Sequence, residues 1–194
     1  MEYGFFHAYN INKVKNMRHF TKILRIFAAV QTNQSKSMEI QNLLSTIQVC
    51  SLEELSAEEQ NAIQLAIEGT NRSYTPYSKF HVGAGVVLNN GQEFVGCNQE
   101  NAAFPAGICA ERSALFAAGA QFPQEPVKIL AIAARGTDGE LTTEPVSPCG
   151  TCRQVIIETE TRFHQQLIIL LYGKRCIYRV EGIRQLMPLS FTEF

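Results

Sequence analysis

The chain has 194 residues, of which 45% are hydrophobic and 18% charged, values that are typical of a folded globular protein and exclude a disordered one. The formal net charge of -1 conceals an asymmetry, because six of the 17 basic residues but one of the 18 acidic residues lie in positions 1–37. Positions 38–194 therefore carry a net charge of -6, which disfavours long nucleic acids as substrates and favours a small uncharged molecule.

The basic N-terminal stretch differs in composition from the rest of the chain. Apolar residues at positions 23–27 are interleaved with Lys22 and Arg25 and could form a basic amphipathic helix. Such a helix could be an organelle-targeting or membrane-surface segment, or a dispensable extension ahead of a natural start at Met38. Few serines and no obvious cleavage site favour the second interpretation. We expect residues 1–48 to be an extension outside the fold and residues 49–194 to form one domain.

The six cysteines bear on the cellular compartment. The longest apolar run near the start, residues 26–30, is too short for a secretory leader, and no stretch approaches the length of a membrane span. We therefore predict a cytoplasmic protein without a membrane partner. In a reducing compartment, clustered cysteines bind a metal more often than they form disulfides.

Regular patterns begin near residue 50. Two capping-box signatures, Ser51-x-x-Glu54 and Ser56-x-x-Glu59, predict a helix that ends near Gly69, and Asn89-Asn-Gly91 predicts a hairpin turn. Five strands are expected at 80–88, 93–96, 128–134, 166–171 and 177–180, with further helices at 109–118, 148–159 and 183–187. A hairpin followed by alternating helices and strands indicates an α/β sandwich with a mixed five-stranded sheet.

Three cysteines lie at the starts of two predicted helices. Unpaired backbone N–H groups and the helix dipole lower a thiol pKa at that position and favour the thiolate that a metal requires. Cys149 and Cys152 are three residues apart, so their sulfurs share one side of a helical turn, and Cys109 comes from the other helix. Three protein ligands on tetrahedral Zn²⁺ leave a fourth position for water, which is typical of a catalytic zinc site.

Two charged residues follow the first cysteine. Glu111 is well placed to move protons between a metal-bound water and a substrate. Arg112 could hydrogen-bond a thiolate and offset the net charge of the zinc centre. Cys109-x-Glu111 followed by Pro148-Cys-x-x-Cys152 matches the zinc deaminase signature, with cysteine in place of histidine as the first ligand. A Cys-x-x-Cys pair alone would equally fit a structural or redox site, so the prediction depends on the combination.

With these motifs the chain resembles the small, homotetrameric cytidine deaminases. The matching runs are 74–84, 96–102, 104–112 and 148–154, and residues 186–191 are similar to the C-terminal segment of that family. The resemblance implies a three-layer α/β/α sandwich and one Zn²⁺ per subunit. It also implies hydrolytic deamination of cytidine and deoxycytidine in pyrimidine salvage, in a homotetramer whose sites are completed by neighbouring subunits.

The same resemblance implies roles for individual residues. It places Asn98 and Glu100 at the ribose 3′-hydroxyl and Phe80 against the pyrimidine ring, with Phe191 stacking on that ring from a neighbouring subunit. The backbone of Ala110 and the carboxyl group of Glu111 would recognise the base. Tyr77 and Phe104 would belong to the intersubunit and pocket surface, although the family often has tyrosine at the position of Phe104.

Three alternatives remain open on the residues alone. A deaminase for a nucleoside antibiotic such as blasticidin S uses the same zinc motif, but Asn98, Glu100 and Phe191 favour ordinary nucleosides. A polynucleotide-editing deaminase shares the chemistry, and the acidic body disfavours it. A zinc-stabilised binding module without catalysis normally has four protein ligands, whereas this pattern supplies three and keeps Glu111.

Overall fold

The computed structural model describes residues 38–192, and the fold below is that of the part from Leu43 onward. The predicted amphipathic helix near the N-terminus lies outside the described residues. The α-helices are α2 (Ala57–Thr70), α3 (Ala110–Gln121) and α4 (Gly150–Phe163), and the 3-10 turns are η2 (Leu52–Glu54), η3 (Phe104–Ala106) and η4 (Ile183–Gln185). The strands are β1 (Gln48–Cys50), β2 (His81–Leu88), β3 (Glu93–Cys97), β4 (Val127–Arg135), β5 (Ile168–Tyr172) and β6 (Ile177–Glu181).

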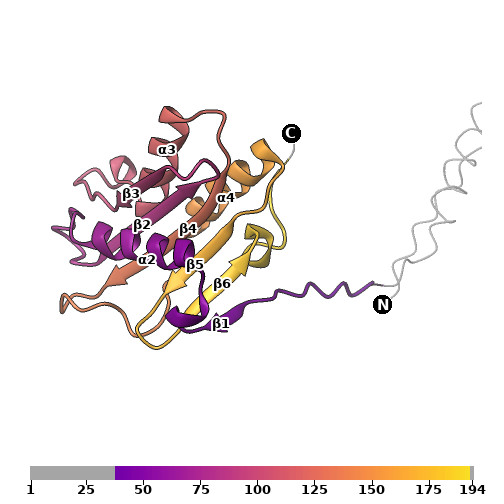
Figure 1. The fold of residues 1–194 in the computed structure, drawn as a ribbon, viewed down its shortest axis with the longest axis horizontal. Coiled ribbons are helices and arrows are strands. Elements are labelled where there is room, and N and C mark those ends of the chain that lie inside the picture. Colours follow the sequence, from indigo (N-terminus) through magenta and orange to yellow (C-terminus); the bar gives the residue numbers. More distant parts are fainter. Residues whose placement is uncertain (1–37, 193–194) are drawn as a thin grey trace, which may run out of the picture. The chain divides into compact units, whose positions relative to one another are not determined.

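The strands form one mixed sheet in the order β1-β6-β5-β4-β2-β3 (Figure 1). Only β4 and β5 pair in parallel, and the other neighbours are antiparallel. The sheet has six strands where five were predicted, because the short strand β1 pairs with β6. Three residues are too few for the alternation of polar and apolar side chains to reveal a strand, so the pairing depends on the tertiary fold.

Helices cover both faces of the sheet, which confirms the three-layer α/β/α sandwich. On one face, buried residues of α2 such as Ile63 and Ala66 pack against the side chains of β2, β4 and β5 that point toward the helix. On the other face α3, α4 and η4 share a second core, which includes Ala114 and Ile156. Alternate residues of each central strand therefore enter opposite cores, as the two-residue repeat of a strand requires.

Strand directions bring the ends of several elements together. Both β3 and β4 run antiparallel to β2, so β3 and β4 point the same way and end at the same edge of the sheet. The connections from β3 to α3 and from β4 to α4 leave that edge, and β2 begins there. The first turns of α3 and α4 and the residues before β2 therefore meet, although they are far apart in the sequence.

A close approach between α3 and β3 fixes this geometry. A Cβ atom on Gly96 would lie 2.3 Å from the carbonyl oxygen of Ala110 and 2.6 Å from the backbone nitrogen of Ala114. Only glycine permits backbone contact at that distance. The start of α3 is thereby held directly against the strand that leads into Asn98 and Glu100.

Most of the predicted elements are confirmed, with small shifts at their ends. Ser51 caps η2 while Ser56 caps α2, so the two capping boxes belong to two elements rather than to one helix. Pro148 precedes the N-cap Cys149 and is not in the first turn of α4 as predicted. The predicted hairpin joins β2 to β3, with Gly91 at a φ of 81°.

Candidate metal centre and active site

Three cysteine thiols meet where α3 and α4 begin. Cys109 is the N-cap of α3 and Cys149 is the N-cap of α4, while Cys152 lies in the first turn of α4. The three Sγ atoms lie within 4.8 Å of one another. The fold therefore assembles the three cysteines that the sequence nominated as metal ligands.

The spacing of these sulfurs suits a tetrahedral metal. Cys109 Sγ lies 3.9 Å from Cys149 Sγ, and Cys149 Sγ lies 3.5 Å from Cys152 Sγ. Ligands at the usual Zn–S distance in a tetrahedron are about 3.8 Å apart. The separations are also far longer than a disulfide bond, and all three thiols are free. The donor set and its spacing fit Zn²⁺.

Neighbouring groups prepare one of these thiols for ionisation. Hydrogen bonding from Cys152, followed by contributions of Arg112 and Cys149, lowers the pKa of Cys109 to about 5. The Arg112 side chain donates from Nη2 to Cys109 Sγ over 3.7 Å, as the sequence suggested. The same coupling to Cys109, together with burial, raises the pKa of Cys152. In the metal-free cluster Cys109 therefore ionises before Cys152, and metal binding would release the protons that the cluster still holds.

The carboxyl group of Glu111 is enclosed beside the cluster. Glu111 is 4% exposed, and burial followed by the charge on Cys109 raises its pKa above the usual value. It lines a cavity of about 200 Å³ together with Cys109 and Cys149. A raised pKa favours the protonated form of Glu111, so that a carboxyl group in such a cavity can give a proton as well as accept one.

Other residues of this cavity come from the start of β2 and the residue before it, from the chain after β3, from β4 and from the segment that leads into α4. The sequence prediction included Phe80 and Asn98, and both line it. Sequence reasoning missed four further residues, for which periodicity indicated only core or loop positions: Val82, Ile132, Val146 and Ser147. The apolar residues give the cavity walls against which a planar ring could pack.

Asn98 has a bracing role that the sequence did not reveal. Its Oδ1 accepts a hydrogen bond from the Val82 N–H at 2.9 Å, and its Nδ2 donates to the Phe80 carbonyl at 3.0 Å. These bonds fix the backbone on both sides of His81, and hence the position of Phe80. The amide keeps a second Nδ2 hydrogen for which the described residues provide no partner.

Glu100 braces the preceding loop in a similar way. Its Oε2 accepts the N–H groups of Tyr77 at 2.9 Å and Ser78 at 3.2 Å, and hydrogen bonding led by Ser78 lowers the pKa of the carboxyl group. Glu100 lines a second, adjoining cavity of about 300 Å³ with Asn98 and Cys109. The two cavities thus share the residues Asn98 and Cys109. The family resemblance assigned sugar recognition to Asn98 and Glu100, which both line the second cavity.

Three predicted aromatic residues lie at the surface. Phe104 is 77% exposed and lines the second cavity, and Tyr77 meets it edge-to-face with ring centroids 6.3 Å apart. Phe191 is 64% exposed and belongs to neither of the cavities beside the cysteines. Ala110, by contrast, is fully buried as the first residue of α3 and lines neither of these cavities.

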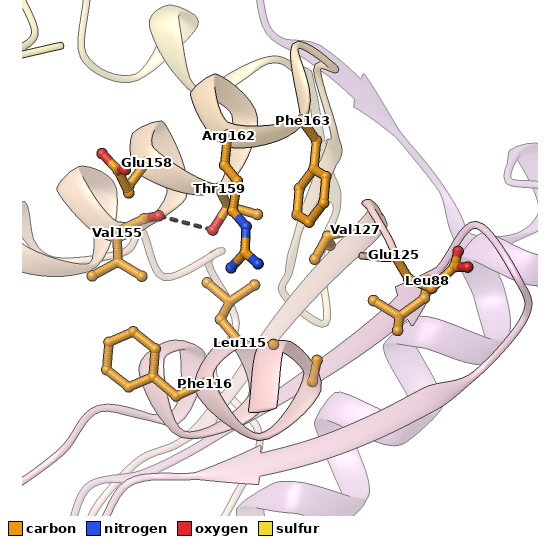
Figure 2. A pocket seen from close by; sticks show the side chains of 12 residues that line it. Leu88, Leu115, Phe116, Glu125, Val127, Val155, Glu158, Thr159, Arg162 and Phe163 are labelled. Atoms are coloured by element: carbon orange, nitrogen blue, oxygen red, sulfur yellow. Dashed lines mark hydrogen bonds between the residues drawn. The ribbon is translucent and has the colours of Figure 1, made fainter. Parts of the chain in front are cut away.

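A separate cavity of about 290 Å³ lies between the far turns of α3 and α4. Figure 2 shows its apolar walls, to which Leu88, Leu115 and Val127 contribute, with the Arg162 guanidinium reaching across it. Phe116, at its rim, is 52% exposed. No cysteine lines this cavity, so the chemistry indicated by the sequence belongs to the other end of the helices.

No helix within residues 38–192 combines the length and hydrophobicity that crossing a bilayer would demand.

Comparison with known proteins agrees with this geometry. The family "Cytidine and deoxycytidylate deaminase zinc-binding region" matches residues 56–165. A cytidine deaminase of Halalkalibacterium halodurans is 40% identical over 101 residues, which are 52% of this chain and 71% of that protein. One from Sporosarcina psychrophila is 44% identical over 107 residues, 55% of this chain and 68% of that protein.

Solved structures show the same relationship. The crystal structure of cytidine deaminase from Burkholderia pseudomallei superposes with a TM-score of 0.59 and 35% sequence identity, covering 71% of this chain and all of that one. A cytidine deaminase from Mycobacterium tuberculosis gives a TM-score of 0.56 at 26% identity over 71% of this chain and all of that one. The matched family includes the stretch that holds all three clustered cysteines and Glu111. The chain belongs to the cytidine and deoxycytidylate deaminase family and carries its zinc-binding region.

Proposed function

We propose that the protein deaminates cytidine and deoxycytidine hydrolytically, giving uridine and deoxyuridine with release of ammonia. The observation that carries this proposal is the enclosed carboxyl group of Glu111, which shares one cavity with two of three clustered thiols. The related proteins named above as cytidine deaminases support the choice of substrate.

Cys109, Cys149 and Cys152 would hold the metal in this proposal. When bound there, Zn²⁺ supplies Lewis acidity that lowers the pKa of a coordinated water. Arg112 donates to the Cys109 sulfur and so offsets part of the negative charge of three thiolates. Fewer than four protein ligands is the arrangement expected of a catalytic rather than a structural site.

Glu111 is the proton carrier. In its protonated form it donates to N3 of the pyrimidine, which makes C4 more electrophilic. The carboxylate then takes a proton from the attacking water and passes it to the amino group at C4. The C–O bond at C4 forms first, and the C–N bond then breaks as the amino group leaves as ammonia. The Glu111 carboxylate takes the remaining proton from the C4 hydroxyl group, which leaves the carbonyl group of uridine and restores the protonated form of Glu111. The buried position and raised pKa of Glu111 suit both directions of transfer.

Substrate recognition is assigned to the rest of the cavity wall. Phe80 would pack against the pyrimidine ring. The family resemblance assigns contact with the base to the backbone of Ala110 as well, which begins α3 between Cys109 and Glu111. Asn98 and Glu100 would bind the ribose 3′-hydroxyl through the second Nδ2 hydrogen and Oε1, the atoms that do not brace the 77–82 backbone. Each residue then both shapes the pocket and contacts the sugar.

We further propose a homotetramer in which neighbouring subunits complete each site. The exposed aromatic rings of Tyr77, Phe104 and Phe191 support this assembly, as does the exposed Phe116 beside the apolar cavity of Figure 2. Phe191 would stack on a substrate bound in an adjacent subunit. Light scattering of the purified full chain tests the assembly, and a monomeric mass contradicts it.

The remaining assignments concern the chain as a whole. We propose that residues 49–194 form the catalytic domain and that residues 1–48 are an extension. The first strand, β1, begins one residue before this boundary, at Gln48. Six free thiols support a cytoplasmic location, and the reaction itself supports a role in pyrimidine salvage. A chain that starts at Met38 should keep both its zinc and its activity, and loss of either would assign the extension a function.

One ultraviolet assay separates the candidate activities. The full chain is incubated with cytidine, deoxycytidine, cytosine or blasticidin S, each with and without a chelator. We expect turnover of the two nucleosides and its loss after chelation, with recovery when Zn²⁺ is returned. Turnover of blasticidin S alone would indicate an antibiotic deaminase, and no turnover of any compound by the zinc-loaded protein would indicate a binding module.

A further inference from the structure

The chain after η4 lies against the same face as α3 and α4. Leu186 and Met187 pack against the core on that face, whereas Leu189 and Phe191 are exposed. These residues, 186–192, are called the tail below. The tail has no regular secondary structure, so hydrogen bonds from other elements must set the path of its backbone.

Two consecutive side chains of α4 provide such bonds. Arg153 Nη1 donates to the carbonyl of Leu186 at 2.6 Å, at the beginning of the tail. Gln154 Nε2 donates to the carbonyl of Phe191 at 2.8 Å, near its end. Both side chains come directly after Cys152, so the helix that presents two of the clustered thiols also holds the tail.

Arg153 connects the tail to the cysteine cluster as well. Its Nε donates to the carbonyl of Pro148 at 2.9 Å, and Pro148 immediately precedes Cys149. A guanidinium group presents these donors in one rigid plane, so a single side chain can hold two carbonyls at a fixed separation. Lysine, with its compact ammonium group, cannot reproduce this geometry.

We infer that Arg153 and Gln154 are positioning residues that direct Phe191 away from its own cavity and toward the site of a neighbouring subunit. This inference rests on the proposed deaminase function. Two observations support it. Both hydrogen bonds are donated to backbone carbonyls, which fixes the path of the chain. Phe191 is 64% exposed and lines neither of the two cavities beside the cysteines of its own subunit. The two residues would thus act on substrate binding in a different copy of the chain.

Gln154→Glu is the most direct test, because it keeps the size of the side chain, removes the donor and repels the Phe191 carbonyl. We expect the KM for cytidine to rise about tenfold while kcat stays within about twofold and zinc content is unchanged. Arg153→Lys should raise the KM in the same direction. Gln64→Glu, the same charge change at an exposed position of α2, is the matched control and should match the wild type.

A mixing experiment distinguishes this role from a structural role within one subunit. Chains with Glu111→Ala, whose tail is intact, are co-expressed under a second tag with Gln154→Glu chains, whose own centre is intact, and mixed assemblies are purified. If the tail serves a neighbour, kcat/KM per chain should reach about a quarter of the wild-type value, because one site in four combines an intact centre with an intact tail. If Gln154 acts on its own centre, about a twentieth is expected.

The inference is overturned if Gln154→Glu leaves the KM within twofold of the wild type, or if the mixed assemblies show no gain over the Gln154→Glu chains. Loss of zinc in the Gln154→Glu protein would also overturn it, because the residue would then support the metal centre. Failure of the proposed function looks different, since the wild-type chain itself would then not turn over cytidine.

Discussion

The two ends of the α3–α4 pair carry different kinds of side chain. At the first turns lie two N-cap cysteines and the enclosed Glu111, around a cavity of about 200 Å³ that combines these ionisable groups with apolar walls. At the last turns lies a larger apolar cavity of about 290 Å³, with Arg162 in the final turn of α4. Helix N-termini offer unpaired N–H groups and a positive dipole end that stabilise thiolates, whereas C-termini favour cations. The polarity of the helices thus decides which end can hold the metal.

The largest effect is expected from removing a thiol at the first turns. Cys152→Ala should abolish zinc binding and reduce deamination to background, because Cys152 is one of only three nominated ligands. Cys176→Ala, which changes a half-buried thiol outside the cluster, is the control and should keep both. Zinc measured by mass spectrometry and kcat on cytidine give the answer. Stoichiometric zinc in the Cys152→Ala protein would refute the assignment of the cluster.

The next effect concerns the proton carrier. Glu111→Ala should retain zinc and fold yet lose activity by about 10³-fold or more, since no other carboxyl group of the described chain lines its cavity. Zinc content and circular dichroism establish that the centre and the fold are intact. Near-normal turnover by this variant would mean that another group carries the protons.

At the opposite end of the helices, substitutions should affect stability and leave chemistry unchanged. Leu88→Ala enlarges the apolar cavity at a residue that is fully buried, and should lower the free energy of unfolding by about 2–4 kcal/mol. The kcat of the folded enzyme should stay within about twofold. Chemical denaturation and steady-state kinetics measure the two quantities, and a large loss of kcat would show that the two ends are coupled.

A smaller effect is expected from the arginine beside the cluster. Arg112→Gln removes the donor to Cys109 and leaves more negative charge on the centre, so the pH at which activity rises should move upward by about one unit. Part of the zinc should be retained. A pH–rate profile of kcat/KM for the zinc-loaded variant measures the shift, and an unchanged profile would exclude this role for Arg112.

The smallest effect concerns the stability cost of a buried acid. Because the pKa of Glu111 is raised in the folded metal-free protein, the folded state holds this proton more tightly than the unfolded chain. The contribution of this group to the free energy of unfolding is therefore most favourable below the unfolded pKa of about 4.5, and it declines as the pH rises toward the folded pKa.

Glu111→Gln removes this dependence. The metal-free variant should exceed the wild type by about 1 kcal/mol at neutral pH, with the difference shrinking on acidification. Urea unfolding of the two chelated proteins at several pH values tests this, and an equal or lower stability of the variant at neutral pH would contradict it.

The sequence by itself predicted most of the helices and strands and nominated the three cysteines that the fold brings together. Cysteines at helix starts, the hairpin at Asn89-Asn-Gly91 and the box that begins at Ser56 are signals read over a few residues, because capping and turn formation are local interactions. The motif spacing likewise placed Glu111 beside the first ligand.

The tertiary structure decided what these pieces meet. The order of the strands, with β2 between β3 and β4, brings Phe80 and Asn98 to the cavity of Glu111, and the same fold adds β1 as a sixth strand. In the folded chain, one side-chain oxygen of Asn98 and one of Glu100 accept backbone N–H groups, and Arg153 and Gln154 hydrogen-bond to the tail. These contacts join residues that are distant along the chain. They are therefore set by the order of the strands and by packing against a shared core, and not by local propensity.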